Sequence, residues 1–567
     1  MRIALAQLNF HIGDFDNNVW LMINVIRKAK KLPADIVVFP ELSVCGYPPR
    51  DFLEFPDFIE KSRMAVEAIA AECFDVAAIV GAPSVNPALK GKSLYNSAWF
   101  LAGGEIKEVF HKTLLPNYDV FDEYRYFEPN RLPYRLAGYK NYKFAVTICE
   151  DLWNMADDPL YVRNPMDELI KLNPDVIINI AASPFHYDQP EIRREIYSRN
   201  AATYKLPVFY VNHVGGQTEL LFDGASMVIA PDGSVFDVMP FFEEEVKVYN
   251  LNDFLYKKSG DGELKTEVGN PEREIRNAKS EMQNPVPGRI PLIHDALVMG
   301  IRDYFGKMDF HRAILGLSGG IDSAVTLALA VSALGSENVL AVMLPSRFSS
   351  PESTQDAVEL AKNLKVPYEI IPIEEGFNTF RETLKPQFGD LPFDLTEENM
   401  QARIRAVILM ALSNKFGYIL LNTSNKSEAA VGYGTLYGDM CGGLSVLGDV
   451  YKMQVYELAG YINRKKKIIP QNTLDRPPSA ELRPDQKDSD SLPDYGILDQ
   501  ILYRYIEKRM GPDELIRDGF DEATVRKVLK LVNTSEYKRY QTPPILRISP
   551  KAFGTGRRLP IVAKYLS

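Results

Sequence analysis

The sequence predicts an α/β protein of two large domains, and three observations support this fold class. Short β-branched runs alternate with amphipathic helical patterns over residues 1–250, and a second pattern of the same kind occupies residues 291–567. The stretch between them, residues 251–290, is polar and rich in turn-forming residues, which indicates a linker. A chain of 567 residues is also too long for one hydrophobic core.

Each half of the sequence contains its own predicted elements. In the first half, strands are expected at 35–40, 76–80, 144–148, 176–180 and 208–211. In the second half, a helix is expected near 292–305, with strands at 339–344 and 418–421. The proline- and charge-rich stretch 476–491 predicts a long loop, and loops of this length often act as lids.

The composition is that of an ordinary globular enzyme, with 46% hydrophobic and 25% charged residues. No apolar run reaches the roughly 18 residues that a membrane span needs, and the N-terminal residues lack signal-peptide features, so we expect a cytoplasmic protein. Four cysteines, Cys45, Cys73, Cys149 and Cys441, show no CxxC spacing, which argues against a zinc site or a disulfide framework. The net charge of −10 gives no general attraction to nucleic acid.

A glycine loop stands between a predicted strand and a predicted helix in the second half. It reads Ser318-Gly-Gly-Ile-Asp-Ser323. Two adjacent glycines allow backbone N–H groups to close around an oxyanion, and the two serine hydroxyls add donors at the positive end of the helix. The loop is not a Walker motif, because no Gly-Lys-Ser/Thr follows. An ordinary strand-to-helix turn is the alternative, but Asp322 and both serines favour a pyrophosphate site.

Three residues of the first half are candidates for catalysis because each follows an apolar strand: Glu41, Lys112 and Cys149. The carboxyl ends of strands meet at one edge of an α/β sheet, so residues distant in sequence can converge there. A thiolate is a nucleophile, a carboxylate relays its proton, and a lysine lowers the thiol pKa and stabilises an oxyanion. Taken alone, a free cysteine is more often part of the core, and we interpret Cys45, Cys73 and Cys441 in that way.

The sequence around these residues carries a family resemblance. Four short segments occur in order: Phe39-Pro-Glu-Leu42, His111-Lys-Thr-Leu-Leu-Pro116, Cys149-Glu-Asp-Leu-Trp153 and Ala182-Ser-Pro-Phe185. Together they resemble the nitrilase (carbon–nitrogen hydrolase) family, whose fold is an α-β-β-α sandwich. The resemblance implies Cys149 as nucleophile, Glu41 as general base and Lys112 as oxyanion support.

The same resemblance extends to a glutamine site. In glutaminase members of the family, positions that match Tyr118 and Ser183 hold the glutamine, and a basic residue commonly occupies the position of Gln189. We include Gln189 in the predicted glutamine site despite that departure. Glu123 is either an auxiliary carboxylate or one half of a surface salt bridge.

The glycine loop resembles the signature of the ATP pyrophosphatase superfamily, whose domain is a doubly wound parallel sheet and whose members cleave ATP between the α and β phosphates. Further segments follow at 343–350, 399–405, 422–428, 438–439 and 447–452. They resemble the NAD synthetase family over most of residues 291–567. With the nitrilase-like half included, the whole chain resembles the glutamine-dependent NAD synthetase family.

This second resemblance implies two sets of binding residues. The ATP set is Gly316, Leu317, Ser318, Gly319, Gly320, Ile321, Asp322, Ser323, Arg403, Thr423 and Lys452. The deamido-NAD set is Asn399, Glu428, Tyr433, Gly434, Thr435, Leu436 and Lys538. The carboxylates of Asp322 and Glu428 are hard oxygen ligands that suit Mg²⁺ beside a polyphosphate, while Arg403 and Lys452 can neutralise phosphate charge.

The resemblance implies a complete reaction. Glutamine is hydrolysed through a thioester on Cys149, ATP adenylates the nicotinate carboxylate of deamido-NAD, and ammonia displaces AMP to give NAD. It also implies a homo-oligomer that uses glutamine, ATP, deamido-NAD and Mg²⁺, without nucleic acid or a membrane.

Two other functions are possible at this stage. An amidotransferase with another acceptor, as in GMP or asparagine synthetases, is disfavoured because the segments that begin at Asn399 and Asn422 resemble NAD synthetases and not those families. A non-catalytic nucleotide-binding regulator is disfavoured because both sets of chemical residues are complete.

Overall fold

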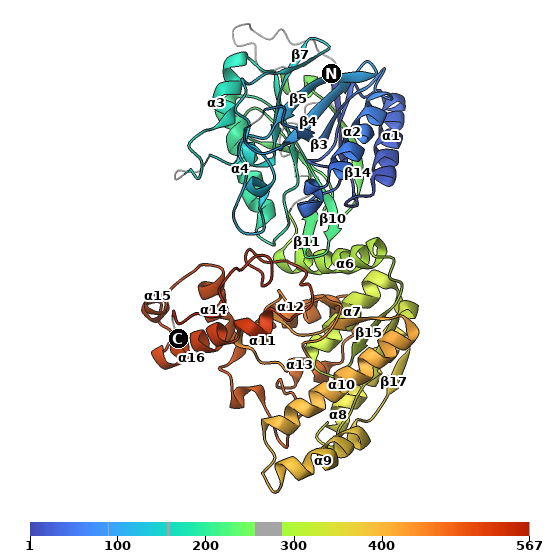
Figure 1. Cartoon of the computed structure of the whole chain (residues 1–567), viewed down its shortest axis with the longest axis vertical. Helices are drawn as coiled ribbons and strands as arrows, with labels where there is room; N and C mark the ends of the chain where they lie inside the picture. Colours follow the sequence, from blue (N-terminus) through green and yellow to red (C-terminus); the bar gives the residue numbers. More distant parts are fainter. Residues whose placement is uncertain (89, 156–158, 256–285, 566–567) are drawn as a thin grey trace, which may run out of the picture. The chain divides into compact units, whose positions relative to one another are not determined.

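The computed structural model describes residues 1–88, 90–155, 159–255 and 286–565. Helices and strands alternate along the described chain, as Figure 1 shows. The chain divides into two compact units.

The first unit comprises Met1–Gln217 and Leu221–Pro287, and the second comprises Thr218–Leu220 and Gly288–Ser567. Most of the predicted linker, at 256–285, lies outside the described residues. The domain boundaries inferred from the sequence therefore stay a prediction.

The first unit contains two six-stranded sheets. In order across the first sheet, the strands are β14 (Glu245–Asn250), β1 (Arg2–Gln7), β2 (Ile36–Val38), β3 (Ala77–Val85), β4 (Leu94–Ala102) and β5 (Glu105–His111). Across the second sheet they are β13 (Val235–Val238), β12 (Met227–Ile229), β9 (Val208–Asn212), β8 (Val176–Ala181), β7 (Tyr142–Ile148) and β6 (Ala137–Tyr139). A separate pair consists of β10 (Val214–Gln217) and β11 (Leu220–Asp223). All five strands predicted for the first half are present.

Helices cover the outer faces of both sheets in the first unit. The α-helices are α1 (Phe15–Lys31), α2 (Pro56–Ala70), α3 (Pro165–Leu169), α4 (Gln189–Tyr204) and α5 (Asn252–Leu255). One apolar core joins the inner faces of the two sheets, and a second lies between the first sheet and the helices α1 and α2. Figure 1 shows α1 and α2 on one side of the strands and α3 and α4 on the other. This arrangement is the predicted α-β-β-α sandwich.

The central strands of the second sheet were predictable from the sequence because each is a predominantly apolar run. Strands β7, β8 and β9 are parallel, and every residue of β8 is buried. A parallel strand covered on both faces is apolar throughout and does not alternate with polar residues. The carboxyl ends of β7 and β8 point to the same edge of the sheet, where the segments that begin at Cys149 and Ala182 start.

The second unit contains a five-stranded parallel sheet. Its strands, in order across the sheet, are β17 (Tyr368–Ile370), β16 (Val339–Met343), β15 (Ala313–Gly316), β18 (Ile419–Asn422) and β19 (Leu444–Ser445). The chain runs outward from β15 in both directions, so the strand order reverses between β15 and β18. In doubly wound sheets, ligands bind outside the carboxyl ends of the strands at such a switch point.

The helices of the second unit surround that sheet and extend beyond it. They are α6 (Arg289–Lys307), α7 (Ile321–Leu334), α8 (Pro351–Leu364), α9 (Glu374–Phe388), α10 (Leu395–Phe416), α11 (Lys426–Val431), α12 (Lys452–Asn463), α13 (Gln471–Asp475), α14 (Tyr495–Ile506), α15 (Pro512–Arg517), α16 (Glu522–Thr534) and α17 (Glu536–Arg539). Helix α10 packs on β15 and β18, while α6, α7 and α12 pack on one another. A smaller apolar core holds α11, α14 and α16 together.

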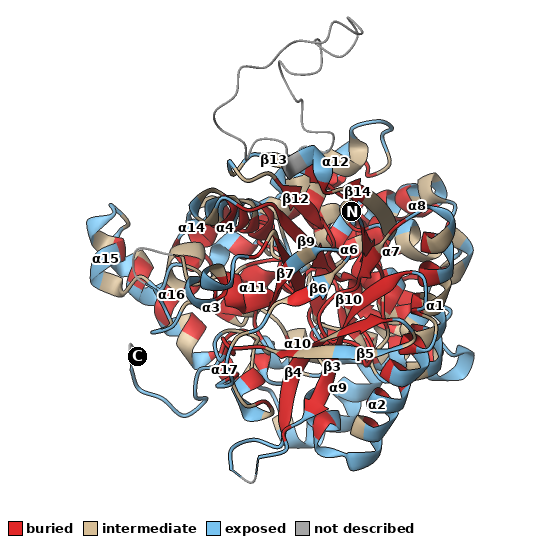
Figure 2. Ribbon diagram, turned by 90° about the horizontal axis from the view of Figure 1, so that it is seen from above, coloured by how far each residue is buried: buried red, intermediate tan, exposed pale blue. Residues whose placement is uncertain are grey.

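Burial follows this layering. In Figure 2 the strands are mostly buried, and helices such as α2 and α15 expose a face. No helix in the described part of the chain is both long and apolar enough to cross a membrane.

Candidate active sites

Glu41, Lys112 and Cys149 form a buried cluster in the first unit. Glu41 lies three residues after β2, Lys112 directly follows β5, and Cys149 directly follows β7. The Nζ atom of Lys112 is 2.7 Å from Oε1 of Glu41, and both side chains are fully buried. The charges of Glu41 and Lys112 both act on the Cys149 thiol. The three residues that the sequence singled out thus lie together.

The backbone at Cys149 has an uncommon conformation. Its φ of 42° lies in the left-handed region, which residues with a side chain seldom adopt unless their surroundings hold them there. The Nδ2 atom of Asn179 donates to the carbonyl oxygen of Cys149 at 3.3 Å, and the Tyr197 hydroxyl donates to Oδ1 of Asn179 at 3.0 Å. Buried neighbours therefore fix the turn that carries the thiol.

Electrostatics keep the thiol protonated at rest. Burial raises the pKa of the Cys149 thiol well above its ordinary value, the charge of Glu41 raises it further, and the Lys112 cation opposes both. Burial alone lowers the pKa of Lys112, but the charges of Glu123 and Glu41 outweigh it and raise this pKa. A protonated thiol reacts only after a base removes its proton, and Glu41 is the adjacent carboxylate.

Glu123 completes this cluster. Its Oε1 atom lies 2.9 Å from Nζ of Lys112 and accepts a hydrogen bond from the Tyr47 hydroxyl at 3.1 Å. The side chain of Glu123 is buried, so the surface salt bridge considered from the sequence is wrong. The amide of Asn96, which the sequence analysis did not single out, donates to Glu41 Oε1 at 2.6 Å.

Asp151 connects the lysine to the cysteine turn. Its Oδ1 atom accepts from the backbone N–H groups of Thr113 and Leu114, each at 2.9 Å, and its Oδ2 atom accepts from that of Ile148 at 3.0 Å. These groups flank Lys112 and Cys149. One buried carboxylate therefore sets the distance between the two chain segments.

Tyr118, one of the residues predicted to bind glutamine, contacts Glu150, the residue that follows Cys149. Its hydroxyl donates to Oε1 of Glu150 at 2.8 Å, and the Tyr161 hydroxyl donates to the same atom at 3.0 Å. Glu150 is buried beside Cys149. Sequence reasoning missed Glu150 and Tyr161, although the position of Glu150 next to the cysteine was a usable signal.

Ser183 and Gln189 also lie near the cluster. The backbone N–H of Ala182 donates to Oε2 of Glu41 at 2.9 Å, which places Ser183 one residue away. Gln189, the first residue of α4, donates from Nε2 to Ser183 Oγ at 3.3 Å. The nearby Arg193 is fully buried in an ion pair with Asp223. Because Arg193 is already paired with Asp223, Ser183 and Gln189 offer only neutral hydrogen-bonding groups at this point.

In the second unit, the glycine loop joins β15 to α7 at the switch point of the sheet. The Ser323 hydroxyl donates to the carbonyl of Gly320 at 2.9 Å, and the N–H of Gly320 donates to Ser318 Oγ at 3.2 Å. A Cβ at Gly319 would lie 2.2 Å from the carbonyl oxygen of Ser353, and its φ is +86°, so only glycine fits there.

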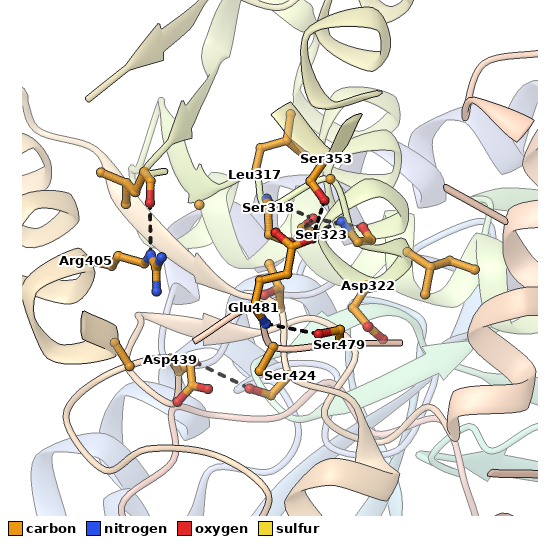
Figure 3. Close-up of a pocket in the computed structure, with 18 of the residues that line it drawn as sticks. Leu317, Ser318, Asp322, Ser323, Ser353, Arg405, Ser424, Asp439, Ser479 and Glu481 are labelled. Atoms are coloured by element: carbon orange, nitrogen blue, oxygen red, sulfur yellow. Dashed lines mark hydrogen bonds between the residues drawn. The ribbon is translucent and has the colours of Figure 1, made fainter. Parts of the chain in front are cut away.

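A cavity of about 320 Å³ opens beside this loop, as Figure 3 shows. All eight residues from Gly316 to Ser323 line it, together with Thr423, Glu428, Tyr433 and Lys452. Of the eighteen predicted ATP, dinucleotide and metal positions, these twelve share one space.

The two arginines of the 399–405 segment occupy different environments. Arg405 lines the cavity, and its Nε atom donates to the carbonyl of Leu344 at 3.0 Å. Burial lowers the pKa of Arg405 to about 10, so the guanidinium remains charged at neutral pH. Arg403 is exposed, does not line the cavity, and donates to the carbonyl of Leu436 at 3.2 Å.

Asp322, Glu428 and Lys452 meet at one end of the cavity. Nζ of Lys452 is 2.6 Å from Asp322 Oδ2 and 3.2 Å from Glu428 Oε1. Burial raises the pKa of Glu428, and the charges of Asp322 and Asp488 add to this effect while Lys452 opposes it. Three carboxyl groups, those of Asp322, Glu428 and Asp488, therefore act at this end of the cavity, and Lys452 can neutralise the charge of one of them.

The remaining predicted dinucleotide residues form a second group beyond Tyr433. The Thr435 hydroxyl donates to Asn399 Oδ1 at 2.6 Å, and Lys538 Nζ donates to the carbonyls of Gly432 and Gly434 at 2.8 Å each. The carbonyl oxygen of Leu436 accepts a hydrogen bond from Nε of Arg403. Asn399, Thr435, Leu436 and Lys538 do not line the main cavity.

The predicted lid loop lines the cavity. The Ser353 hydroxyl donates to Oε1 of Glu481 at 2.7 Å, and the Tyr433 hydroxyl donates to Asp488 Oδ1 at 3.1 Å. Figure 3 shows Glu481 directed toward Ser353 and the glycine loop. Sequence reasoning identified the loop but not these two carboxylates.

Comparison with known proteins agrees with both halves of this description. The carbon-nitrogen hydrolase family profile matches residues 2–254, and the NAD synthase profile matches residues 293–542. The chain is 43% identical to the glutamine-dependent NAD(+) synthetase of Synechocystis and 44% identical to that of Acinetobacter baylyi, over 98–99% of each chain. The chain belongs to the glutamine-dependent NAD(+) synthetase family.

Solved structures extend the comparison. The glutamine-dependent NAD+ synthetase of Acinetobacter baumannii, in complex with ADP, is 40% identical, with a TM-score of 0.75 over 99% of this chain and 98% of that one. The synthetase of Cytophaga hutchinsonii shares the fold, with a TM-score of 0.80 at 20% identity over 99% and 98%. The predicted fold class is therefore confirmed.

The NAD synthetase family uses ATP as a substrate, which raises the question of a metal ion. Among the described residues, no group of three or more His, Cys, Asp or Glu side chains forms a metal site. Asp322 and Glu428 provide two carboxylates within reach of one cation, Lys452 Nζ. This donor set fits a Mg²⁺ ion that takes its other ligands from phosphate oxygens and water.

Proposed function

We propose that this chain hydrolyses glutamine in its first unit and uses ATP in its second unit to amidate deamido-NAD, giving NAD, AMP, pyrophosphate and glutamate. The proposal depends on one observation above all. The buried Glu41–Lys112–Cys149 cluster and the cavity at the glycine loop occur in a single chain that aligns over almost its full length with glutamine-dependent NAD(+) synthetases.

In the first half-reaction, Glu41 takes the proton of the Cys149 thiol, and the thiolate attacks the side-chain carbonyl carbon of glutamine. Lys112 stabilises the oxyanion of the tetrahedral intermediate, and the proton on Glu41 passes to the amide nitrogen, which leaves as ammonia. Water then hydrolyses the thioester: Glu41 takes a proton from water, the water oxygen bonds to the acyl carbon, the C–S bond breaks, and the proton on Glu41 returns to the Cys149 sulfur as glutamate leaves.

Substrate recognition in this half follows from the groups around the cluster. The Glu150 carboxylate, held by the hydroxyls of Tyr118 and Tyr161, would bind the α-ammonium group of glutamine. The Ser183 hydroxyl and the Gln189 amide would bind its α-carboxylate through neutral hydrogen bonds.

In the second half-reaction, the glycine loop holds the phosphates of ATP while the nicotinate carboxylate attacks the α-phosphorus. The bond between the α-phosphorus and the bridging oxygen breaks, and pyrophosphate leaves. Lys452 and Arg405 would neutralise the charge that develops on it. Ammonia then attacks the carbonyl carbon of the adenylate and displaces AMP. Asn399, Tyr433 and Lys538 would contribute to the dinucleotide site.

Asp322 and Glu428 would hold Mg²⁺ at the phosphates, where the ion would supply additional charge neutralisation. The roles of Arg403, Gly434, Thr435 and Leu436 stay predictions from the family resemblance. A homo-oligomeric state and a cytoplasmic location also stay predictions.

Product identification tests this proposal. The purified protein is incubated with ATP, Mg²⁺, glutamine and one acceptor at a time: deamido-NAD, xanthosine monophosphate or aspartate. We expect an amidated product only with deamido-NAD, with one AMP and one glutamate formed per NAD. Amidation of another acceptor, or NAD formation without AMP, would contradict the proposal.

A further inference from the structure

Asn96, on β4, has an unusual hydrogen-bonding pattern in the glutaminase cluster. Its Nδ2 atom donates to Glu41 Oε1 at 2.6 Å and to Glu123 Oε2 at 3.5 Å. Its Oδ1 atom is buried and has no hydrogen-bond partner among the described residues. A buried amide normally satisfies both its donor and its acceptor groups, so the oxygen needs an explanation.

The position of Asn96 is well fixed. The side chain is buried, and the backbone N–H of Lys112 donates to the carbonyl oxygen of Asn96 at 2.9 Å. The strand and the lysine segment therefore hold the amide against the two carboxylates. Only rotation about the side-chain bonds can change which of its ends faces them.

The other neighbours of these carboxylates act as donors. Glu41 accepts from Lys112 Nζ and from the N–H of Ala182, and Glu123 accepts from Lys112 Nζ and the Tyr47 hydroxyl. Such surroundings suit two ionised carboxylates. A carboxyl group that has taken a proton becomes a donor itself and needs an acceptor.

The reaction requires such a protonated state. In the proposed function, on which this inference rests, Glu41 carries the thiol proton between Cys149 and the leaving ammonia. Burial also raises the pKa of Glu123 to about 7, with the charge of Glu41 adding to the effect and Lys112 opposing it. The carboxylate pair therefore holds a proton during turnover.

We propose that Asn96 is a positioning residue that serves both protonation states of the Glu41–Glu123 pair. In the structure Nδ2 donates to both carboxylates, which is the arrangement that suits two ionised groups. When one carboxyl holds the proton, a half-turn of the amide places Oδ1 against it as the acceptor. Because Oδ1 has no partner in its present position, the half-turn breaks no hydrogen bond on that side of the amide.

Two substitutions separate this role from simple packing. Asn96→Leu keeps similar volume but removes both the donor and the acceptor. Asn96→Asp keeps the shape, and only its protonated form offers a donor and an acceptor together. The matched control is Ser97→Ala, because Ser97 is buried on the opposite face of β4 and bonds to Ser84 and His111.

The measurement is glutamate release as a function of pH. We expect Asn96→Leu to lower kcat about 100-fold with a KM for glutamine within about threefold of wild type. Loss of the donor disfavours ionised carboxylates, so the acid limb of its profile moves up by about one pH unit. In Asn96→Asp, activity falls as the new carboxyl ionises, so the alkaline limb moves down. Ser97→Ala keeps both limbs in place.

Parallel profiles, in which both Asn96 variants lose the same factor at every pH, would overturn the proposal. If Asn96→Leu does not fold, the isosteric Asn96→Asp decides alone, and an unmoved alkaline limb overturns it. The Cys149→Ala variant distinguishes a failure of the proposed function from a failure of the role assigned to Asn96. Glutaminase activity that survives in Cys149→Ala contradicts the proposed function, whereas an inactive Cys149→Ala with parallel Asn96 profiles overturns only the role of Asn96.

Discussion

The glutaminase cluster and the nucleotide cavity differ in how far each is assembled by the fold itself. Glu41 and Lys112 are fully buried, paired at 2.7 Å and anchored within three residues of the ends of their strands. The cavity of the second unit, about 320 Å³, is lined in large part by loops, including residues 476–482. Groups held by strands are positioned by the core, while groups on loops depend more on their ligand. The first site is therefore preorganised, and the second should be completed by ATP.

The largest expected effect concerns the acidic end of the cavity. Asp322→Asn should lower NAD formation about 10³-fold with either glutamine or ammonia, because it removes a proposed magnesium ligand and a partner of Lys452. The measurement is NAD formation by mass spectrometry. Asp309→Asn, at an exposed aspartate, is the control. Near-normal synthesis in Asp322→Asn would show that this carboxylate does not serve the reaction.

The second prediction tests the preorganised cluster. Glu41→Gln and Lys112→Met should each lower glutamate release by about 10³-fold. The two substitutions should nevertheless shift the pKa of the Cys149 thiol in opposite directions. Glu41 raises the pKa of Cys149 and Lys112 lowers it. The pH profile of alkylation by iodoacetamide should therefore shift to lower pH in Glu41→Gln and to higher pH in Lys112→Met. Shifts in the same direction would contradict this account of the electrostatics.

The third prediction compares two arginines on one helix. Arg405→Leu should raise the KM for ATP about 10- to 100-fold, because it removes a charged donor from the cavity. Arg403→Leu should change it less than about threefold, since Arg403 is exposed and outside the cavity. Steady-state synthesis with ammonia measures both. The reverse ranking would show that ATP rearranges this helix.

The smallest expected effect is on stability. Asp151→Asn replaces one acceptor that faces backbone N–H groups with a donor, so unfolding in urea should become easier by about 2 kcal/mol. Asp175→Asn is the matched control, because Asp175 accepts one backbone N–H of Lys143 at an exposed site. Equal shifts of the urea midpoint in both variants would mean that Asp151 does not tie the two segments together.

The comparison also explains which residues were predictable. Glu41, Lys112 and Cys149 each follow an apolar strand, so the local sequence locates them. Asn96 lies within a strand, and its contact to Glu41 spans 55 positions, for which the sequence carries no local signal. The buried partners of Glu123 are equally non-local, which is why its environment was left open.

The second site shows a different limit. The glycine loop was readable because a strand, two glycines and a helix stand in order. Arg403 and Arg405 are two positions apart on α10, and only the packing of Ile404 and its neighbours decides which arginine faces the cavity. Glu481 and Asp488 lie on an irregular loop, whose path follows from tertiary contacts and not from a periodic pattern.

The nitrogen-donor dependence of Cys149→Ala tests the division of labour between the two units most directly. NAD formation by this variant is measured with glutamine and, separately, with ammonium chloride, each with saturating ATP, Mg²⁺ and deamido-NAD. The account predicts that synthesis from glutamine is abolished while synthesis from ammonia stays within about twofold of wild type, because the thiol serves only the first half-reaction. Equal loss with both donors, or retained synthesis from glutamine, would contradict it.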